Sequence, residues 1–446
     1  MKLQKVLIAN RGEIACRIIR SCKSRGLKTV AVYSEADREL PYVSLADEAV
    51  LIGPPPVAKS YLNMEAILEA ASRTGADSIH PGYGFLSENA VFAQKVIDRG
   101  LIWIGPEPGV IARMGDKVTA RRTMMEAGVP VVPGTDGLGS IEEAVREAGK
   151  IGFPVMLKAS AGGGGIGMQV SRDALELEKT FPSTQSRAKA YFGDETLFLE
   201  KWIERSRHVE VQIAADSAGN VIHLFERECS VQRRNQKVIE ESLSPSIQPE
   251  TRVRLYEAAV RAAKAVRYTG VGTVEFLLGP DDEFYFLEMN TRLQVEHPVT
   301  ESITGLDLVD LQLSLVEGEH LPVTQEQVQA SGHAMEFRIY AEDPVTFMPS
   351  PGRLTKFHPP QGEGIRIDAG VETGNTVSPF YDPMIAKCIV SGFSRKEVLE
   401  RSRQALKDFQ VEGIKTNLPL LLELLEHPEF VSGHYSTQIL NKSTNK

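Results

Sequence analysis

A lysine placed just before a run of glycines is the first feature of this sequence that could do chemistry. Lys158 precedes Gly162, Gly163, Gly164 and Gly165, and apolar, strand-like residues lie on both sides of the run. Consecutive glycines cost backbone entropy on ordering and offer no packing, so we expect them to present bare N–H groups to phosphate oxygens. A Walker A loop has its lysine after the glycines and opens a helix, whereas here the chain returns as a strand. The segment therefore predicts a hairpin flap over phosphates; a flexible surface loop is the alternative.

Two glutamates are predicted to face each other across a hairpin formed by residues 272–290. If the hairpin turns symmetrically at Asp281 and Asp282, Glu275 lies directly opposite Glu288. Like charges opposed at about 5 Å are unfavourable, so this pairing implies a bound cation or a raised pKa. Carboxylate oxygens together with a phosphate-binding loop indicate Mg²⁺ that bridges ATP phosphates. Two surface glutamates tolerated by solvent are the alternative.

A row of polar residues continues from the second glutamate. If the chain stays extended there, side chains two residues apart project from one face of the strand. These residues are Glu288, Asn290, Arg292, Gln294 and Glu296. They predict a surface that binds metal at one end and a small anion at the other, with Glu296 as a base. An ordinary solvated strand edge is the alternative.

Composition and charge limit the classes of function. The chain has 446 residues, 42% hydrophobic and 24% charged, which suits a globular protein of two or three domains. Its formal net charge of -9 argues against nucleic acid as the main partner, because phosphate-backbone binders usually carry a basic face. The four cysteines lack metal-binding spacing, so we expect reduced, mostly buried thiols and a cytoplasmic location. No targeting segment and no apolar run of about 18 residues occurs, so no membrane association is expected.

The elements that must position these residues begin with a parallel βαβ unit. Residues 6–9 and 30–32 read as strands, and the apolar residues between them recur at helical spacing. The turn at residues 10–13 has one glycine and not G-x-G-x-x-G, so NAD binding is not expected, although Asp37 stands where a ribose-binding acid could be. Two further strand signals end near residues 84 and 106. We expect the first domain to span residues 1–114.

Two more domains are expected after it. The second spans residues 115–334 and includes a lid subdomain, about residues 131–203, that carries the glycine run. Strand and hairpin signals dominate from there to about residue 298, and residues 307–316 follow a helical pattern. The third, residues 335–446, mixes strands with Pro and Gly and closes with helical patterns at 395–409 and 417–426. The predicted fold class is α/β, with an α+β character overall.

The chain resembles the biotin carboxylase family of ATP-grasp enzymes over essentially its whole length. The matching motifs are the glycine run and residues 8–13, 80–89, 114–117, 207–210, 229–234, 288–298 and 337–339. The resemblance implies an ATP-grasp fold with an N-terminal Rossmann-like domain, a mobile lid and a C-terminal mixed β/α domain.

The resemblance also implies a role for individual residues. ATP would be bound by Lys117, Lys158, Gly164, Gly165, Glu200, Lys201, Trp202, Ile203, His208, Gln232, Asn235, Glu275, Leu277 and Glu288. Mg²⁺, or Mn²⁺ in its place, would be held by Glu275, Glu288 and Asn290. Bicarbonate would be bound by Lys237, Arg292, Gln294 and Val295, and Glu296 would deprotonate it. Tyr83 and Arg338 would lie near biotin.

The implied reaction is the ATP-dependent carboxylation of biotin by bicarbonate through carboxyphosphate. Bicarbonate is a poor electrophile, so phosphoryl transfer must activate it, and Arg292 and Lys237 would stabilise the charge that collects. Arg338 would stabilise the enolate-like ureido group of biotin, and a lid would exclude water. Because the sequence holds no Met-Lys-Met attachment motif, the partners would be a biotin carboxyl carrier protein and carboxyltransferase subunits. A homodimer is expected, and the final acceptor could be acetyl-CoA, propionyl-CoA, another acyl-CoA or urea.

Four positions depart from the family pattern. Ile166 stands where the loop usually carries an arginine or lysine, and Ala161 replaces a glycine. Asn235 stands where a histidine is expected, and Tyr42 occupies a frequent histidine position. The departures predict weaker ATP binding, but they remove no metal ligand and no base. Two other hypotheses are a carboxylate-amine ligase of the ATP-grasp group and a non-catalytic nucleotide-binding paralogue.

Overall fold

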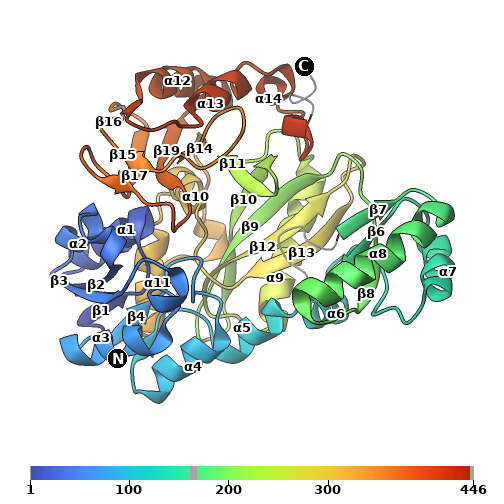
Figure 1. Ribbon diagram of the computed structural model, residues 1–446, viewed down its shortest axis with the longest axis horizontal. Helices are drawn as coiled ribbons and strands as arrows, with labels where there is room; N and C mark the ends of the chain where they lie inside the picture. The colour runs from blue at the N-terminus through green and yellow to red at the C-terminus, as the bar shows by residue number, and fades with distance from the viewer. Residues whose placement is uncertain (1, 161–167, 442–446) are drawn as a thin grey trace.

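The N-terminal region is a parallel sheet with helices packed on it. The computed structural model describes residues 2–160 and 168–441, and its first sheet has the strand order β3-β2-β1-β4-β5 with parallel neighbours (Figure 1). Its elements are β1 (Lys5–Ile8), α1 (Gly12–Ser24), β2 (Lys28–Ser34), α2 (Pro41–Leu45), β3 (Glu48–Gly53), α3 (Met64–Thr74), β4 (Ser78–His80), α4 (Ala90–Asp98) and β5 (Ile102–Trp103). The predicted βαβ unit is confirmed.

Two polar residues of this region belong to its packing. Asp37 is buried and forms an ion pair with Arg11, with 2.6 Å between Nε and Oδ2. Tyr42 is fully buried, and its hydroxyl lies 2.8 Å from that of Tyr61, which donates to Asp37 in turn. Asp37 is therefore engaged within the protein, and Tyr42 is a core residue.

A small sheet with its own core forms the region that carries the glycine run. It follows α5 (Pro108–Gly115) and α6 (Lys117–Glu126) and consists of α7 (Ile141–Ile151), β6 (Val155–Ala159), β7 (Met168–Ser171), α8 (Ala174–Phe192) and β8 (Leu197–Lys201). The strand order is β7-β6-β8, and its apolar cluster is drawn from residues 138–199. β6 and β7 pair antiparallel, so the predicted hairpin is confirmed. This unit projects to the right in Figure 1.

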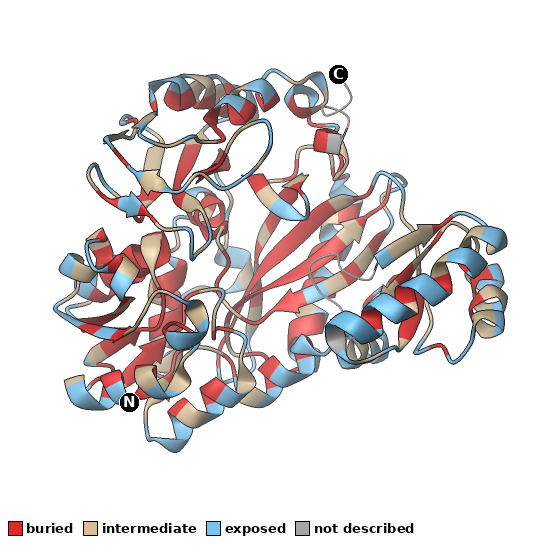
Figure 2. Ribbon diagram, in the orientation of Figure 1, coloured by how far each residue is buried: buried red, intermediate tan, exposed pale blue. Residues whose placement is uncertain are grey.

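The central sheet has the strand order β13-β12-β9-β10-β11-β14-β19-β17. Its middle part consists of β9 (Arg207–Ala215), β10 (Val221–Arg233), β11 (Gln236–Ser242), α9 (Pro249–Ala265), β12 (Gly270–Leu278), β13 (Phe284–Asn290), α10 (His297–Thr304) and α11 (Leu308–Val316). Figure 2 shows its inner strands as almost wholly buried. The 17-residue helix α9 lies within the stretch where strand and hairpin signals were expected to dominate, and the prediction gave no helix there.

The C-terminal region continues the same sheet. It contains β14 (His333–Tyr340), β15 (Gly352–Arg353), β16 (Lys356–His358), β17 (Ile365–Ala369), β18 (Thr376–Val377), β19 (Met384–Gly392), α12 (Arg395–Asp408), β20 (Gln410–Glu412), α13 (Leu418–Leu424) and α14 (Pro428–Ser432). β14 pairs antiparallel with β11, and all eight of its residues are buried. The sheet runs without a break across residue 334. The domain boundaries at 114 and 334 and the lid range stay predictions. All four cysteines lie in the described part of the chain and are free and buried.

The hairpin of β12 and β13 reaches the predicted register by an unpredicted route. Glu275 pairs with Glu288, as expected from the sequence. A bulge follows, however, because Phe276 pairs with Phe286 and the Leu287 position is the extra residue. The loop is closed by the Gly279 N–H, which donates to the Glu283 carbonyl at 2.7 Å. The predicted symmetric two-residue turn is therefore wrong, and the bulge restores the register at the two glutamates.

Candidate active site

A row of charged side chains crosses four neighbouring strands of the central sheet. Arg227 on β10 pairs with Glu210 on β9, and Glu210 pairs with Glu275 on β12. Glu275 pairs with Glu288 on β13. Directly paired residues of adjacent strands point to the same face of a sheet, so all four side chains share one face. The two predicted glutamates are thus the outer end of a longer row.

Lys237 neutralises the acids at the inner part of this row. Its ammonium donates to Glu210 Oε2 at 2.6 Å, to Glu275 Oε1 at 3.0 Å and to Glu296 Oε1 at 2.5 Å. Burial alone would lower the pKa of Lys237, but these carboxylates raise it well above its ordinary value. Lys237 therefore stays charged and holds the three acids together.

Glu296 lies between two cations. In addition to Lys237, Arg338 approaches it, with 2.9 Å between Nη2 and Oε2. Burial by itself would raise the pKa of Glu296, yet Lys237 and Arg338 outweigh it and lower that pKa. The carboxylate is therefore in its basic form at neutral pH, as a proton acceptor must be. On its other side, the Arg338 Nε donates to Glu240 Oε1 at 2.6 Å, and burial raises the pKa of Glu240 to about 7.

The predicted metal ligands meet at the outer end of the row. Glu275 Oε1 accepts from Asn290 Nδ2 at 2.9 Å, and Glu275 Oε2 lies 2.7 Å from His208 Nε2. Glu288 keeps exposed surface, and partial desolvation of its carboxylate together with the Glu275 charge raises its pKa. Carboxylate and amide oxygens at this place fit a divalent cation of the Mg²⁺ type.

Lys117 lies close enough to Glu288 for the two charges to interact. Asp116 caps α6 by accepting from the Thr119 N–H at 2.7 Å, which places Lys117 at the first position of that helix. The Lys117 charge lowers the pKa of Glu288 and so counteracts part of the rise. A phosphate-binding role requires a cation near the predicted metal ligands, and Lys117 provides one.

The other predicted nucleotide-binding residues lie on the small sheet and on the edge of the central one. Lys158 on β6 forms a short ion pair with Glu200 on β8. The Lys201 ammonium donates to the Gly152 carbonyl at 2.8 Å, so this side chain is used within the protein. The backbone N–H groups of Lys201 and Trp202 also donate, to Pro133 and Pro154. Gly164, Gly165 and the departures Ala161 and Ile166 lie outside the described residues.

The remaining predicted nucleotide-binding residues lie at different places on the central sheet and next to it. His208 Nδ1 lies 2.7 Å from Gln232 Nε2, so the two side chains form one unit next to Glu275. Leu277 and Ile203 are half-buried. Asn235 is exposed at the turn between β10 and β11, with φ of 64°. Asparagine tolerates this left-handed conformation, so the turn gives a structural reason for the residue found there.

A cavity of about 330 Å³ lies next to Glu296 and brings together three regions of the chain. Its walls include Tyr83 from the N-terminal region, Arg292 and Val295 from the central one and Arg338 from β14. Arg292 pairs with Glu88 at 2.8 Å, and Tyr83 donates to Glu13. Two of the predicted anion-binding residues, Arg292 and Val295, and both predicted biotin-binding residues, Tyr83 and Arg338, thus line one cavity.

The predicted extended row beyond residue 288 is not what brings its members together. β13 ends at Asn290, and Glu296 directly precedes α10 with φ of -82° and ψ of 9°. Gln294 and Glu296 still reach the row, because Gln294 Nε2 donates to Glu275 Oε1 at 2.7 Å and Glu296 pairs with Lys237. The prediction of convergence is confirmed, but the strand that was expected to produce it is absent from this described segment.

Sequence reasoning missed several buried partners of the site. Glu210, Arg227 and Glu240 were given no role, although Glu210 closes one of the recognised motifs. Their pairing depends on the register between β9, β10, β11 and β12. The sequence of one strand does not specify this register. The available signal was the alternation of His208, Glu210 and Gln212 with apolar residues along β9, which marks Glu210.

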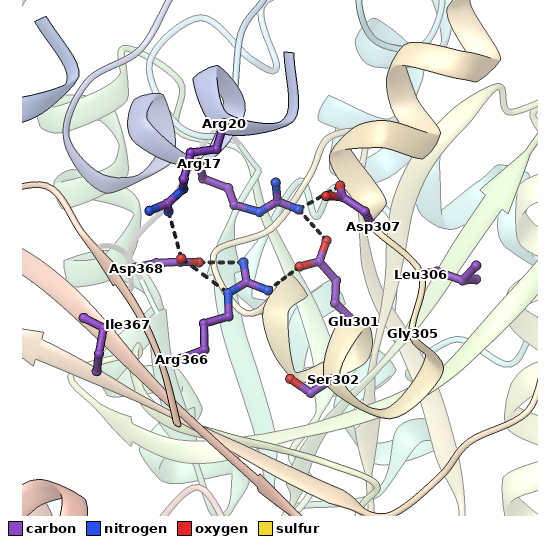
Figure 3. A pocket seen from close by; sticks show the side chains of 10 residues that line it. All are labelled: Arg17, Arg20, Glu301, Ser302, Gly305, Leu306, Asp307, Arg366, Ile367 and Asp368. Atoms are coloured by element: carbon purple, nitrogen blue, oxygen red, sulfur yellow. Dashed lines mark hydrogen bonds and ion pairs between the residues drawn. The ribbon is translucent and has the colours of Figure 1, made fainter. Parts of the chain in front are cut away.

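A second polar pocket, of about 470 Å³, is lined by ion pairs that connect neighbouring elements, and we assign it no ligand. Figure 3 shows its charged residues paired with one another. The pairs are Arg17 with Glu301 and Asp307, Arg366 with Glu301 and Asp368, and Arg20 with Asp368, at 2.7 to 2.9 Å. Three arginines and three acids leave no excess charge for a ligand. The network ties α1 to α10, the start of α11 and β17.

Family models match three consecutive parts of the chain. The models are described as biotin carboxylase N-terminal domain over residues 2–111, carbamoyl-phosphate synthase L chain ATP binding domain over 116–324, and biotin carboxylase C-terminal domain over 336–442. No helix of the described residues is both long and apolar enough to cross a membrane.

Relatives share the full extent of the chain. A biotin carboxylase of Halalkalibacterium halodurans is 57% identical over 435 residues, which cover 97% of this chain and 96% of that protein. A biotin carboxylase of Nostoc is 51% identical over 444 residues, or 99% of each of the two chains.

Solved structures have the same architecture. The biotin carboxylase of Campylobacter jejuni, solved as its beta-gamma-ATP complex, has a TM-score of 0.95 with 45% identity and 99% of each chain covered. The biotin carboxylase domain dimer of Hydrogenobacter thermophilus 2-oxoglutarate carboxylase, solved with MgADP, ADP and bicarbonate, has a TM-score of 0.94 with 45% identity over 99% of this chain and 98% of that one. The predicted fold class, with its ATP-grasp core, is confirmed.

Proposed function

We propose a specific reaction for this chain, which belongs to the biotin carboxylase family of ATP-grasp ligases. The enzyme carboxylates biotin with bicarbonate at the expense of ATP and releases ADP and phosphate. The observation that carries the proposal is the position of Glu296. It is a buried, ionised carboxylate held by Lys237 and Arg338, and it lies beside the cavity lined by Arg292, Val295 and Tyr83.

The first step is phosphoryl transfer to bicarbonate. A bicarbonate oxygen forms a bond to the γ-phosphorus of ATP, the bond to the β-phosphate oxygen breaks, and ADP leaves with that electron pair. Lys117, Lys158, Gly164 and Gly165 would contact the phosphates. Lys201, Trp202 and Ile203 would hold the adenine through backbone groups other than the N–H groups of Lys201 and Trp202, which donate to Pro133 and Pro154, since the Lys201 side chain is also bonded to Gly152. Glu200, His208, Gln232, Asn235 and Leu277 would complete the nucleotide site.

Glu275, Glu288 and Asn290 would hold the magnesium ion of MgATP. Their oxygen atoms suit a hard divalent cation. Desolvation and then the Glu275 charge raise the pKa of Glu288, and such a cation would offset both. When bound, the ion supplies neutralisation of the charge that develops on the transferred phosphoryl group. Mn²⁺ would serve in its place.

Arg292, Lys237, Gln294 and Val295 would bind bicarbonate, and Glu296 would accept its proton. The carboxyphosphate formed then decays to CO₂ and phosphate inside the cavity. The phosphate released with CO₂ takes the proton of the ureido nitrogen of biotin, and the nitrogen then attacks CO₂ and forms the new N–C bond. Arg338 would stabilise the charge on the ureido oxygen, and Tyr83, which lines the same cavity, would contact biotin.

We further propose the partners and the setting of the reaction. Biotin is carried by a separate biotin carboxyl carrier protein, and carboxyltransferase subunits pass the carboxyl group on, with acetyl-CoA or another acyl-CoA as the acceptor. The full-length relative from Halalkalibacterium halodurans bears the plain name biotin carboxylase, which agrees with a component of this kind. The enzyme would work as a homodimer in the cytoplasm, where the buried free thiols found here are the rule.

The test is ADP release by the purified chain with MgATP, bicarbonate and free biotin, together with incorporation of labelled bicarbonate into biotin. We expect ADP release that depends on bicarbonate and rises with biotin. Release that instead depends on an added amine would indicate a carboxylate-amine ligase. Nucleotide binding without any ADP release would indicate a non-catalytic paralogue.

A further inference from the structure

Arg227 is a buried arginine at the inner end of the charged row, and none of the roles above uses it. Its side chain is fully enclosed, with no exposed surface. All five of its N–H atoms have an acceptor. Nε donates to Glu210 Oε1 at 2.5 Å, Nη1 to Gln212 Oε1 at 2.6 Å and Thr300 Oγ1 at 3.0 Å, and Nη2 to Thr273 Oγ1 at 3.1 Å and Gln294 Oε1 at 2.6 Å.

One of these acceptors, Gln294, belongs to the proposed anion site, and a second, Glu210, accepts a hydrogen bond from Lys237 of that site. Gln294 receives Arg227 on its amide oxygen, so its amide nitrogen must face the other way, and it donates to Glu275 Oε1 at 2.7 Å. Glu210 receives Arg227 on Oε1 and Lys237 on Oε2. Arg227 thereby fixes the orientation of the Gln294 amide, and it helps to neutralise the carboxylate of Glu210.

The remaining acceptors fix the guanidinium itself. Gln212, Thr273 and Thr300 come from β9, β12 and α10, and each receives one N–H of Arg227. A planar group with five donors in a fixed fork can satisfy this arrangement, whereas a lysine has only three donors around one nitrogen. An arginine so enclosed cannot rotate without breaking several charge-assisted bonds.

We propose that Arg227 is a positioning residue for bicarbonate, which it serves by holding the Gln294 amide with its N–H₂ group toward the anion. The inference rests on the proposed function, because it takes Gln294 as a bicarbonate-binding residue. Without Arg227 the Gln294 amide can turn over and present its oxygen to a negatively charged substrate. Glu210, freed from the guanidinium, would also draw Lys237 away from Glu296.

The first test is Arg227→Lys in the full chain, assayed for ADP release over a range of bicarbonate concentrations. Loss of a charged hydrogen bond to Gln294 should raise the KM for bicarbonate about tenfold or more, with the KM for ATP changed less than about twofold. Arg17→Lys is the matched control, because Arg17 is 5% exposed and paired with two carboxylates outside the site. It should leave the KM for bicarbonate unchanged.

A double-mutant cycle with Gln294→Ala separates positioning from general damage. If Arg227 acts through Gln294, adding Arg227→Lys to Gln294→Ala should raise the KM for bicarbonate by less than about twofold more. The proposal would be overturned if the double variant raised the KM for bicarbonate by the product of the two separate factors. It would also be overturned if Arg227→Lys alone left this KM unchanged. If Arg227→Lys does not fold, Thr300→Val removes a single acceptor of the guanidinium and should raise the same KM by a smaller factor; no change there would also overturn it.

Direct binding distinguishes this inference from the proposed function. Bicarbonate is titrated calorimetrically into the wild-type chain and into Arg227→Lys, each with ADP and Mg²⁺ present. Weaker binding by the variant supports the role of Arg227 even if the wild type does not turn over, and equal binding overturns it. A wild type that binds bicarbonate but releases no ADP would overturn the proposed reaction alone.

Discussion

The inner and outer halves of the charged row differ in how their charges are balanced. In the inner half, Arg227 and Lys237 neutralise Glu210 and Glu296 through bonds of 2.5 to 2.6 Å between buried groups. In the outer half, Glu288 keeps exposed surface, and its pKa is raised by partial desolvation of its carboxylate and by Glu275. The protein thus balances the inner half by itself, and under the proposed function the metal and the nucleotide would complete the outer half.

This difference has a physical reason. Charges taken out of water must be paired within the protein, because an unpaired buried charge costs several kcal/mol. A site that binds a divalent cation must instead keep an unbalanced negative charge where the cation can enter. In the proposed reaction, charge also collects on bicarbonate and on biotin, and the preorganised donors for it, Lys237 and Arg338, lie at the inner half.

The largest effect is expected from Glu296→Ala in the inner half. Loss of the general base should lower biotin carboxylation about 10²–10⁴-fold, because proton transfer contributes that much to typical rates. Nucleotide affinity, which depends on the outer half, should be unchanged. The measurement is carboxybiotin formation together with ADP binding. A Glu296→Ala variant with substantial carboxylation would contradict the base assignment.

Removal of the inner cation should damage the fold as well as the activity. Lys237→Met leaves Glu210, Glu275 and Glu296 without their shared ammonium, and breaking a buried pair in this way costs about 3–5 kcal/mol of unfolding free energy. Denaturant unfolding with and without the substitution gives the value. Unaltered stability would mean that the inner half is not balanced by Lys237.

The outer half should behave in the opposite way. Glu288→Gln removes a like charge from Glu275, so the free energy of unfolding without metal should stay the same or rise slightly. Mg²⁺-dependent nucleotide binding should weaken about 10–100-fold, the range seen even for groups that only support metal ligands. Calorimetric titration of MgADP measures it. A stability loss as large as that of Lys237→Met would abolish the distinction between the halves.

The smallest effect concerns Glu240, the second partner of Arg338. Its pKa is raised to about 7 in the folded protein from an ordinary value of 4.5, so the folded state binds more protons between these values. Its contribution to stability is therefore present below about pH 4.5 and is lost as the pH rises through about 7, with a change of roughly 1–3 kcal/mol. Glu240→Gln should show a flatter dependence of unfolding free energy on pH over this interval. Identical pH dependences would contradict the raised pKa.

Local patterns in the sequence predicted the outer half better than the inner one. The pairing of Glu275 with Glu288 follows from one hairpin, although a bulge at Leu287 and a longer turn were needed to produce it. Arg227 and Glu210 lie on different strands and meet only because β9 pairs with β10 and β12. Register between strands distant in the sequence is set by packing, which no local pattern contains.

The helices and the residues after β13 illustrate the same limit. α9 was taken for part of a strand-rich stretch, although Pro249 at its start and Ala258, Ala259, Ala262 and Ala263 on its buried face are helical signals. Glu296 was placed on an extended strand, whereas the chain turns into α10 and still delivers its carboxylate to Lys237. Period-two spacing predicted which side chains converge, but not the backbone that brings them together.

In the proposed function, Glu275 and Glu288 share one divalent cation beside the nucleotide phosphates. Crystals of the chain grown with ADP and Mn²⁺ test it most directly, because Mn²⁺ replaces Mg²⁺ on oxygen ligands and is located by its anomalous scattering. We predict an anomalous peak within bonding distance of carboxylate oxygens of both glutamates and of a phosphate oxygen. A peak bound elsewhere, with the two carboxylates turned apart into solvent, would contradict the account.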